Sequence, residues 1–347
     1  MKKILILFIL VVTFGAVAFA QVDLQTAAIV RLTRSEPITV GQLRTEVRNA
    51  ESQAGRPLSN TERRQVLDLM INEKLVLQAA ERDRITVTDN EINQQIQTLK
   101  SQMAQQIGRQ PTEDEFAEAI RNETGFAQPA FREQLRRSLI VQKYLMAKKG
   151  SLIENIQMPN EQDIRNFYNL SRTQFVRPDT VRFSMINIPY GVDIASKNRA
   201  RETADRLNRE IGSVPARFDE AYLRGQSSGA GYQAVEGYLP RNLEAQQATG
   251  ANFINAAFAL QQGQISGVIE GLEAYHIVKI TETYSQKSLE LDDIIQPGSR
   301  VTVRDYIGNY LLQERQQAAL VTASNELTTE LRAGNSYQVF DNALSSW

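Results

Sequence analysis

The chain has 347 residues, of which 42% are hydrophobic and 23% are charged, an ordinary composition for a folded protein. It has no cysteine and one histidine, so it is neither a disulfide scaffold nor a lipoprotein anchored through cysteine, and one histidine cannot build a metal site. The formal net charge of −1 gives no electrostatic reason to expect nucleic-acid binding.

Residues 1–20 have the pattern of a cleavable secretory signal. Lys2 and Lys3 precede an apolar run of about a dozen residues, which ends in the small-residue segment Ala18-Phe19-Ala20. An uncleaved membrane anchor is the alternative, but the run is short for a span of about twenty residues. We expect a mature chain that begins at Gln21, with 37 basic and 40 acidic residues once the two signal lysines are removed, a formal charge of −3 and no stable membrane insertion.

Between residues 21 and 150 the sequence predicts a short hairpin and then a series of helices. Two apolar segments, 27–32 and 38–40, flank a turn fixed by Pro37 and are predicted strands. Three capping boxes follow, in which a Ser or Thr hydroxyl and a Glu carboxylate satisfy each other's backbone amides at a helix start. They begin at Ser59, Thr88 and Thr112 and predict helices that end near Asp83, Gly108 and Gly125, before a fourth helix at 127–147 that stops ahead of Gly150.

The predicted helices carry apolar stripes at helical spacing, for example Ile92, Ile96 and Leu99. These stripes either form the core of a helical bundle or stay partly open to hold unfolded chains. The sequence alone leaves both interpretations open.

Beyond residue 178 the hydrophobic pattern changes from the helical period to the alternation of strands. Strands are predicted at 181–189, at 235–239 and twice within 266–280, and helices at 196–211, 218–223, 253–260 and 302–331. A glycine-rich loop at 225–231 has neither the GxxxxGKS or GxxxxGKT motif nor the strand–GxGxxG–helix setting of a phosphate site. We therefore predict a turn there and no ATP binding.

The only histidine, His276, lies in the last of these strands. It shares one face with Val278 and Ile280, and the opposite face is also mainly apolar, as in a central strand. A histidine in an apolar strand is more often a hydrogen-bonded core residue than a catalyst. Both roles remain open at this point.

The order of these elements resembles that of a parvulin-type peptidyl-prolyl isomerase domain. The most specific match is Phe253-x-x-x-Ala257-Phe258-Ala259-Leu260-x-x-Gly263-x-Ile265-Ser266, followed by Tyr275-His276-Ile277. With the signal, the N-terminal helices and the last helix included, nearly the whole mature chain resembles the SurA/PrsA-type periplasmic chaperones that have one parvulin domain.

This resemblance implies an α+β fold. A helical N-terminal chaperone domain (21–177) is expected to be completed by a C-terminal helix (285–347) that packs back on it. A parvulin-like domain (178–284), an antiparallel sheet with surrounding helices, is expected to be inserted between them.

The resemblance also implies the site residues. Parvulin active sites resemble one another in having two histidines on adjacent central strands, a Cys, Asp or Ser acceptor, and an apolar floor under the substrate proline. By this likeness His276 takes the place of the second histidine and Ser227 that of the acceptor, and Phe253, Phe258 and Met185 are substrate-binding candidates. The first histidine is missing, because the family motif V-R-x-S-H is Val181-Arg182-Phe183-Ser184-Met185 here. No metal and no cofactor is expected.

Two functions follow as hypotheses. The first is a periplasmic holdase that binds unfolded outer-membrane or secreted proteins without ATP and whose parvulin-like module has weak or lost activity. The alternative is an active peptidyl-prolyl cis–trans isomerase that assists the folding of envelope proteins. Met185 can pack against a substrate but cannot replace the hydrogen bonds of a histidine, which favours the first hypothesis.

Overall fold

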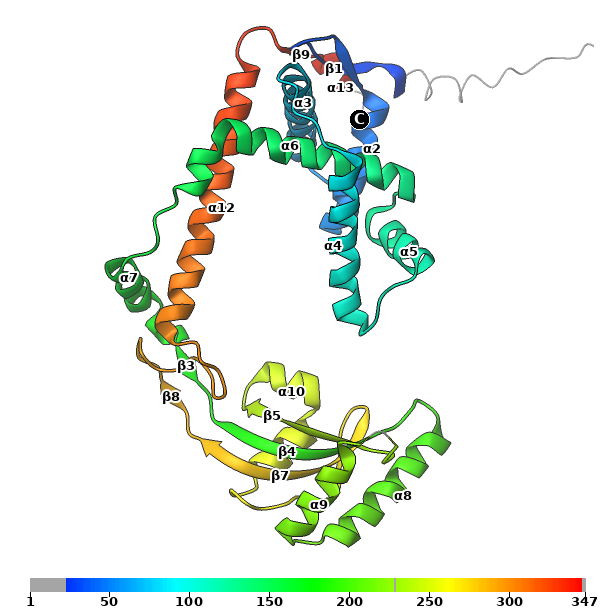
Figure 1. Cartoon of the computed structure of the whole chain (residues 1–347), viewed down its shortest axis with the longest axis vertical. Helices are drawn as coiled ribbons and strands as arrows, with labels where there is room; N and C mark the ends of the chain where they lie inside the picture. Colours follow the sequence, from blue (N-terminus) through cyan, green and yellow to red (C-terminus); the bar gives the residue numbers. More distant parts are fainter. Residues whose placement is uncertain (1–22, 228, 345–347) are drawn as a thin grey trace, which may run out of the picture. The chain divides into compact units, whose positions relative to one another are not determined.

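The computed structural model describes residues 23–227 and 229–344, so the predicted signal at 1–20 lies outside the described residues (Figure 1). The contacts within the chain divide it into two units. The first unit combines the residues up to Gln157 with those from Arg315 onward, and the second runs from Met158 to Glu314. The fold is therefore α+β with one unit inserted in the other, as predicted.

The first unit is built on a small antiparallel sheet of order β2-β1-β9. Its central strand β1 (Thr26–Val30) pairs with β2 (Glu36–Thr39) on one side and with β9 (Tyr337–Val339) on the other. The helices of the unit are α2 (Val40–Ala54), α3 (Asn60–Arg82), α4 (Asp89–Ile107), α5 (Glu113–Thr124), α6 (Gln128–Glu154), the C-terminal part of α12 (Val303–Arg332) and α13 (Asp341–Leu344). The buried side chains of β1 pack with those of α2, α3, α6 and α12 into one hydrophobic core, and α4 and α5 form a second cluster against α6.

The C-terminal part of α12 belongs to this core, which confirms that the last helix completes the N-terminal domain. Leu327 and Leu331 are buried in the same cluster as β1. Arg332 donates hydrogen bonds to Asp68 at 2.9 Å and to Asn72 at 2.6 Å, both on α3. Residues from the N-terminal and C-terminal parts of the chain are thus held together by apolar burial and by charged hydrogen bonds.

The three predicted capping boxes are confirmed at Ser59, Thr88 and Thr112, each closed by a Glu three residues later. The predicted end of the fourth helix is wrong, because α6 continues through Gly150 to Glu154. Contacts with other helices stabilise this extension. Lys148 Nζ lies 2.6 Å from a carboxylate oxygen of Asp83, and Lys149 forms ion pairs with Glu326 at 3.0 Å and Glu330 at 2.7 Å.

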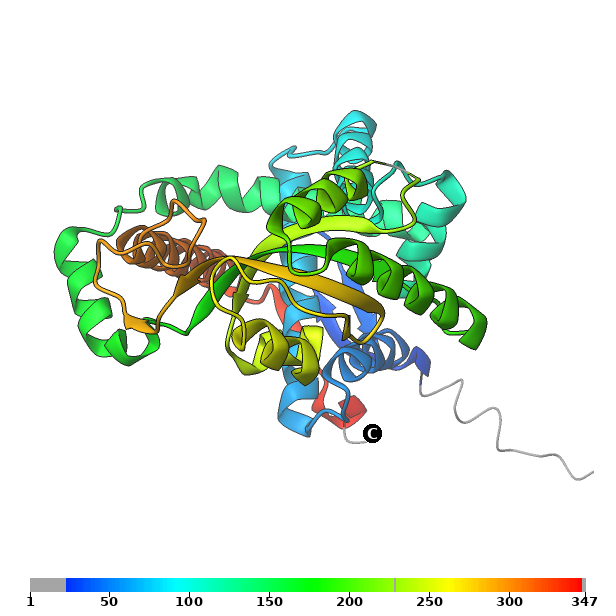
Figure 2. The same ribbon diagram turned by 90° about the horizontal axis from the view of Figure 1, so that it is seen from below.

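The second unit contains a four-stranded antiparallel sheet of order β5-β4-β7-β6, so β7, which carries His276, is a central strand as predicted. Helices α8 and α9 cover one face of this sheet, and α10 and α11 lie at the other (Figure 2). Its elements are β4 (Thr180–Pro189), α8 (Ile194–Ile211), α9 (Pro215–Gly225), β5 (Gln233–Pro240), α10 (Leu243–Thr249), α11 (Ala251–Phe258), β6 (Ile269–Glu270) and β7 (Ala274–Tyr284).

A smaller hydrophobic cluster in the same unit brings together the segments that precede and follow the sheet in the sequence. Helix α7 (Glu161–Ser171) and a short 3-10 turn (Arg172–Gln174) lead to β3 (Val176–Arg177), which pairs with β8 (Lys287–Ser288). The first turns of α12 pack on these elements through Val303 and Ile307, which are fully buried. The cluster has a hydrophobic core of its own.

No helix in the described part of the chain is both long enough and apolar enough to cross a membrane.

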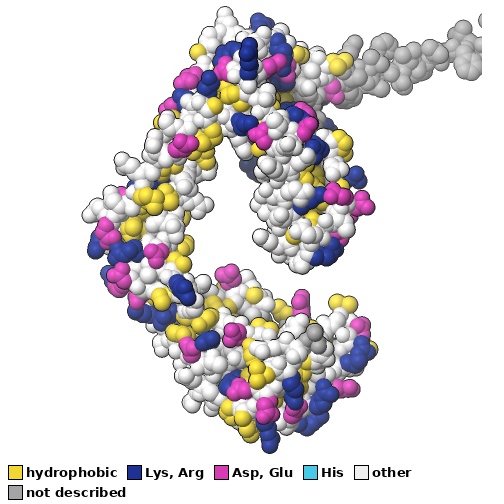
Figure 3. Space-filling view, in the orientation of Figure 1, with side chains coloured by type: hydrophobic (Ala, Val, Ile, Leu, Met, Phe, Trp, Pro, Cys, Tyr) yellow, Lys and Arg dark blue, Asp and Glu magenta, His cyan; other side chains and the backbone are white. Residues whose placement is uncertain are grey.

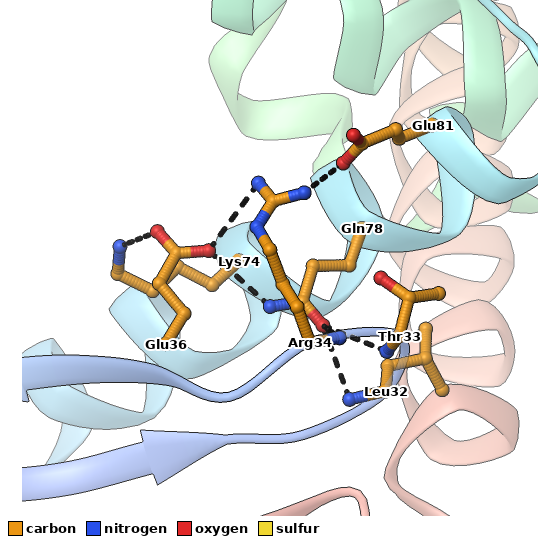
Figure 4. Close-up of polar contacts among 7 residues, drawn as sticks. All are labelled: Leu32, Thr33, Arg34, Glu36, Lys74, Gln78 and Glu81. Carbon is orange, nitrogen blue, oxygen red and sulfur yellow. Dashed lines mark hydrogen bonds and ion pairs between the residues drawn. The ribbon is translucent and has the colours of Figure 1, made fainter.

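A buried glutamine fixes the turn between β1 and β2 (Figure 4). Gln78 of α3 has no exposed surface, and its side-chain oxygen accepts hydrogen bonds from the backbone amides of Leu32 at 3.1 Å and Thr33 at 3.0 Å. Its amide nitrogen donates to Glu36 at 3.2 Å, which is also ion-paired with Lys74. Although burial alone raises the pKa of Glu36, the hydrogen bonds from Lys74 and Gln78 lower it below its ordinary value.

Replacing this glutamine tests its structural role. We expect Gln78→Leu to destabilise the first unit by about 1–3 kcal/mol, because it leaves the turn amides without their buried acceptor. Denaturant unfolding, together with hydrogen exchange at residues 32–34, measures the change. Gln65→Leu, at an exposed position of the same helix, is the matched control. Equal stability and equal exchange in the two variants would contradict this role.

Candidate functional site

The register between β4 and β7 places the predicted site on one face of the sheet. Asn187 pairs with His276, and Met185 pairs with Val278 in the next position of the same face. Met185 and His276 are therefore diagonal neighbours, a spacing of about 7–8 Å that long side chains can span. This face is otherwise apolar, with Val181, Phe183, Leu239, Ile269 and Ile280 buried in the same cluster as Met185 and Val278.

Helix α11 supplies the aromatic part of the site. Phe253 is only 2% exposed, and its ring lies edge-on to Phe183 at 6.1 Å and to His276 at 5.0 Å between ring centres. Phe258, at the end of the same helix, is half-buried beside this cluster, with the Arg241 guanidinium 5.3 Å from its ring centre. The floor is thus apolar and closely packed.

His276 is held in this apolar setting as a neutral side chain. Its Nδ1 atom is buried and has no hydrogen-bond partner among the residues that the structure describes. Burial lowers the pKa of His276 from 6.5 to about 4, because charging the imidazole would cost hydration that nothing nearby replaces. At neutral pH the ring carries no charge.

Gly271 leaves the space in which the imidazole lies. A Cβ atom added at this position would stand 2.3 Å from His276 Nε2, far inside van der Waals contact. Any other residue at 271 would force the histidine ring to move. Sequence reasoning missed Gly271, and no local pattern marks it, since only the return of the chain from β6 to β7 brings it under the ring.

Asn187 is a second residue that sequence reasoning missed. It is half-buried on β4 directly opposite His276, and its amide nitrogen donates a long hydrogen bond of 3.4 Å to Gln233 of β5. The alternation of β4 contains the signal, because Asn187 is the polar member of a face that otherwise carries Val181, Phe183 and Met185. It is the polar group nearest to His276 in the sheet register.

Ser227 has an exposed position. It follows α9 in an exposed turn, where its backbone amide donates to the carbonyl of Arg224 at 3.1 Å. The preceding helix packs on the opposite face of the sheet, through Phe218 and Ala221. The structure therefore brings Met185, Phe253 and His276 together with Phe258 at their side, and among the described residues no hydrogen bond joins Ser227 to His276.

The chemistry available to this face is non-covalent. It offers a packed apolar surface and one neutral imidazole, in which one ring nitrogen donates a hydrogen bond and the other accepts one.

Two protein families match the chain over separate segments. Residues 1–145 match the SurA-like N-terminal domain, and residues 159–296 match the PPIC-type PPIASE domain, which contains all the candidate site residues. The second match gives the parvulin-like resemblance of the sequence an independent basis.

Curated relatives and solved structures are similar to the chain over most of its length. The Foldase protein PrsA of Clostridium botulinum (strain Hall) is 23% identical over 274 residues, or 78% of this chain and 72% of the relative. That of Clostridium kluyveri is 24% identical over 270 residues, with 76% and 74% covered. A structure from work on the SurA-like chaperones PEB4 and Cj1289 of Campylobacter jejuni is 12% identical, with a TM-score of 0.43 and 91% and 100% covered. PrsA from Bacillus subtilis is 20% identical, with a TM-score of 0.29 and 90% and 94% covered.

The single histidine makes its burial directly measurable. In the tag-free chain we expect the imidazole signal in an NMR titration to have its midpoint near pH 4, because burial lowers the pKa of His276 from 6.5 to about 4. The unfolded chain then binds more protons than the folded chain between these values, so this contribution to stability is complete above pH 6.5 and is lost as the pH falls towards 4. His276→Gln should remove that part of the pH dependence. A midpoint near 6.5 would mean that the ring is solvated.

Proposed function

We propose that this chain, which joins a SurA-like N-terminal domain to a single PPIC-type peptidyl-prolyl isomerase domain in the manner of SurA- and PrsA-type chaperones, is a holdase whose isomerase module has weak activity or none. Chaperones of this kind bind unfolded polypeptides. The finer parts of the proposal are that residues 1–20 are removed as a signal, that the protein works in the periplasm, and that its clients are unfolded outer-membrane or secreted proteins.

The buried Nδ1 of His276, which has no hydrogen-bond partner among the described residues, is the observation that carries the proposal of weak isomerase activity. Rotation about an X–Pro bond faces a barrier of about 18–20 kcal/mol, set by amide resonance. An isomerase lowers it by packing the proline ring and by stabilising the twisted amide with polar groups. Here the diagonal neighbour of His276 is Met185, which supplies packing and no hydrogen bond to orient the imidazole.

The helices of the first unit support the holdase role. Helix α6 has 27 residues, and Tyr144 is the only one of them that is fully buried. Several large apolar side chains of this unit remain exposed to a third or more, among them Leu69, Ile107, Met146, Leu152 and Val321. Partly exposed apolar surface of this kind suits weak, exchangeable contacts with unfolded chains and needs no ATP.

A second candidate function is an active peptidyl-prolyl isomerase. The packed floor of Phe253 and Met185 favours it, because a proline ring binds to apolar surface. Ser227 and His276 are its candidate catalytic residues and Phe253, Met185 and Phe258 its candidate substrate contacts, all carried over from the parvulin resemblance. Because isomerisation is slow enough to limit folding, both activities would serve the same clients.

The holdase role is tested with an aggregating client. We expect the mature chain, in several-fold excess and without ATP, to reduce the light scattering of an unfolded outer-membrane porin diluted from urea. A folded protein of equal size serves as the control for crowding. Unchanged scattering would reject the holdase role.

The state of the isomerase site is tested by restoring the missing histidine. In a protease-coupled assay on proline tetrapeptides, we expect the wild type to be close to the uncatalysed rate. Met185→His should raise kcat/KM at least about tenfold, or about 1.4 kcal/mol of transition-state stabilisation, by giving His276 a polar neighbour. Met185→Leu keeps the packing without the polar group and should leave the rate unchanged. High wild-type activity, or no gain from Met185→His, would contradict the proposal that this is a parvulin-like site weakened by the loss of its first histidine.

A further inference from the structure

A pocket of about 300 Å³ lies in the small cluster formed by α7, β3, β8 and the first turns of α12. Four aromatic rings, Phe167, Phe175, Tyr306 and Tyr310, form much of its lining, and none of its lining residues belongs to the face that carries His276. We call it the aromatic pocket. Nothing in the isomerase chemistry of the sheet uses it.

The walls of the aromatic pocket are held in place by the core beneath them. Phe175 is 7% exposed and stacks on Tyr168 at 5.8 Å between ring centres, and the hydroxyl of Tyr168 donates to the carbonyl of Leu289 at 2.9 Å. Phe167 contacts Tyr310 at 5.2 Å. The pocket is therefore formed before any ligand enters, which lowers the entropic cost of binding.

The charge around the pocket selects the occupant. No lining residue is charged, and Gln174 is the one polar amide among them. Among the charged neighbours, Arg172 pairs with Glu290 at 2.9 Å and Lys287 with Asp293 at 2.6 Å, and Glu314 accepts a hydrogen bond from the Tyr310 hydroxyl at 2.8 Å. An ionic group entering the pocket would lose its hydration and gain no counter-charge, whereas an uncharged side chain of aromatic or leucine size fits the lining.

The rim is open and lies beside the two-stranded sheet of β3 and β8. Tyr306, Tyr310 and Val176 are 47%, 39% and 38% exposed, and hydrophobic side chains lie among charged ones over α7 and the start of α12 on the face shown in Figure 3. Val176 is also a residue of β3, whose two residues pair only with β8 in the described sheet. An extended backbone can add to such an edge while one of its side chains enters the pocket.

We propose that the aromatic pocket binds one large uncharged side chain of an extended client polypeptide. This inference rests on the proposed chaperone function and deepens it, because it gives the second unit a site for clients that requires no proline. The client side chain packs against the apolar lining of the pocket, and the client backbone beside it is extended and adds to the edge of the short sheet.

Methyl NMR on the full chain tests the proposal. Methyl groups of Val176, Leu289 and Ile295 line the pocket, while those of Ile188 and Ile277 are buried between the four-stranded sheet and helices α8 and α9. The probes are capped, proline-free peptides, acetyl-Ser-Gly-Phe-Gly-Ser-amide and its counterparts with Ala or Glu in place of Phe. We expect the Phe peptide to shift the pocket methyls alone and to bind at least about tenfold more tightly than the other two.

Two variants and a control locate the binding. Val176→Lys puts a charge into the lining, and Tyr310→Ala removes an exposed wall; each should weaken the Phe peptide at least about fivefold. Leu170→Lys, at a position of α7 that is 88% exposed and does not line the pocket, should stay within about twofold of the wild type. Unshifted methyls at millimolar peptide in the folded chain, or equal binding of the Glu peptide, would overturn the proposal.

A second copy of the chain is the competing occupant. Pocket methyls that move with protein concentration in the absence of peptide would identify it and would equally overturn the assignment. The aggregation assay on the wild type separates this inference from the proposed function. Suppressed scattering with unshifted pocket methyls would reject the pocket proposal and leave the holdase role standing. Shifted pocket methyls with unsuppressed scattering would reject the holdase role and leave the pocket proposal standing.

Discussion

The antiparallel register of β4 and β7 is the constraint on which the candidate site depends. It sets Asn187 against His276 and Met185 against Val278, so that one face receives the histidine, the methionine and the ring of Phe253 from α11. A slip of β4 by one residue would turn Asn187 and Met185 to the α8 and α9 face. Apolar packing on both faces prevents that slip, and the same packing leaves His276 neutral and one of its nitrogens without a described partner.

Features encoded by neighbouring residues could be predicted from the sequence. The capping boxes at Ser59, Thr88 and Thr112 have all their hydrogen-bonding groups within four residues, and the alternation of β7 fixes which side chains share a face. The segment from Phe253 to Ser266 likewise contains the helix and turn that carry the parvulin resemblance. The grouping of Met185 with Phe253 and His276 required the resemblance as well, because strand pairing over about ninety residues is not a local signal.

Features that depend on distant partners could not be predicted. Helix α6 passes Gly150 because Lys148 and Lys149 meet Asp83 at the end of α3 and two acids on α12, which outweighs the local preference to end the helix there. Strand β9 has three residues and is defined by its pairing with β1. Gly271 matters for His276 only because the chain returns beneath the ring, and the exposed place of Ser227 could not be seen from its spacing to Gly237.

The pairing of β1 with β9 also sets the order in which the protein can be completed. Arg31 and Gln338, which meet beside these strands, are separated by 307 positions, so the first strand is synthesised long before its neighbour exists. At about 5–20 residues per second, this delay is roughly 15–60 s. All residues of the inserted unit emerge within that interval, and the N-terminal unit stays without its edge strand and without Leu327 and Leu331. The N-terminal unit therefore cannot reach its complete fold until Leu327, Leu331 and strand β9 have been synthesised.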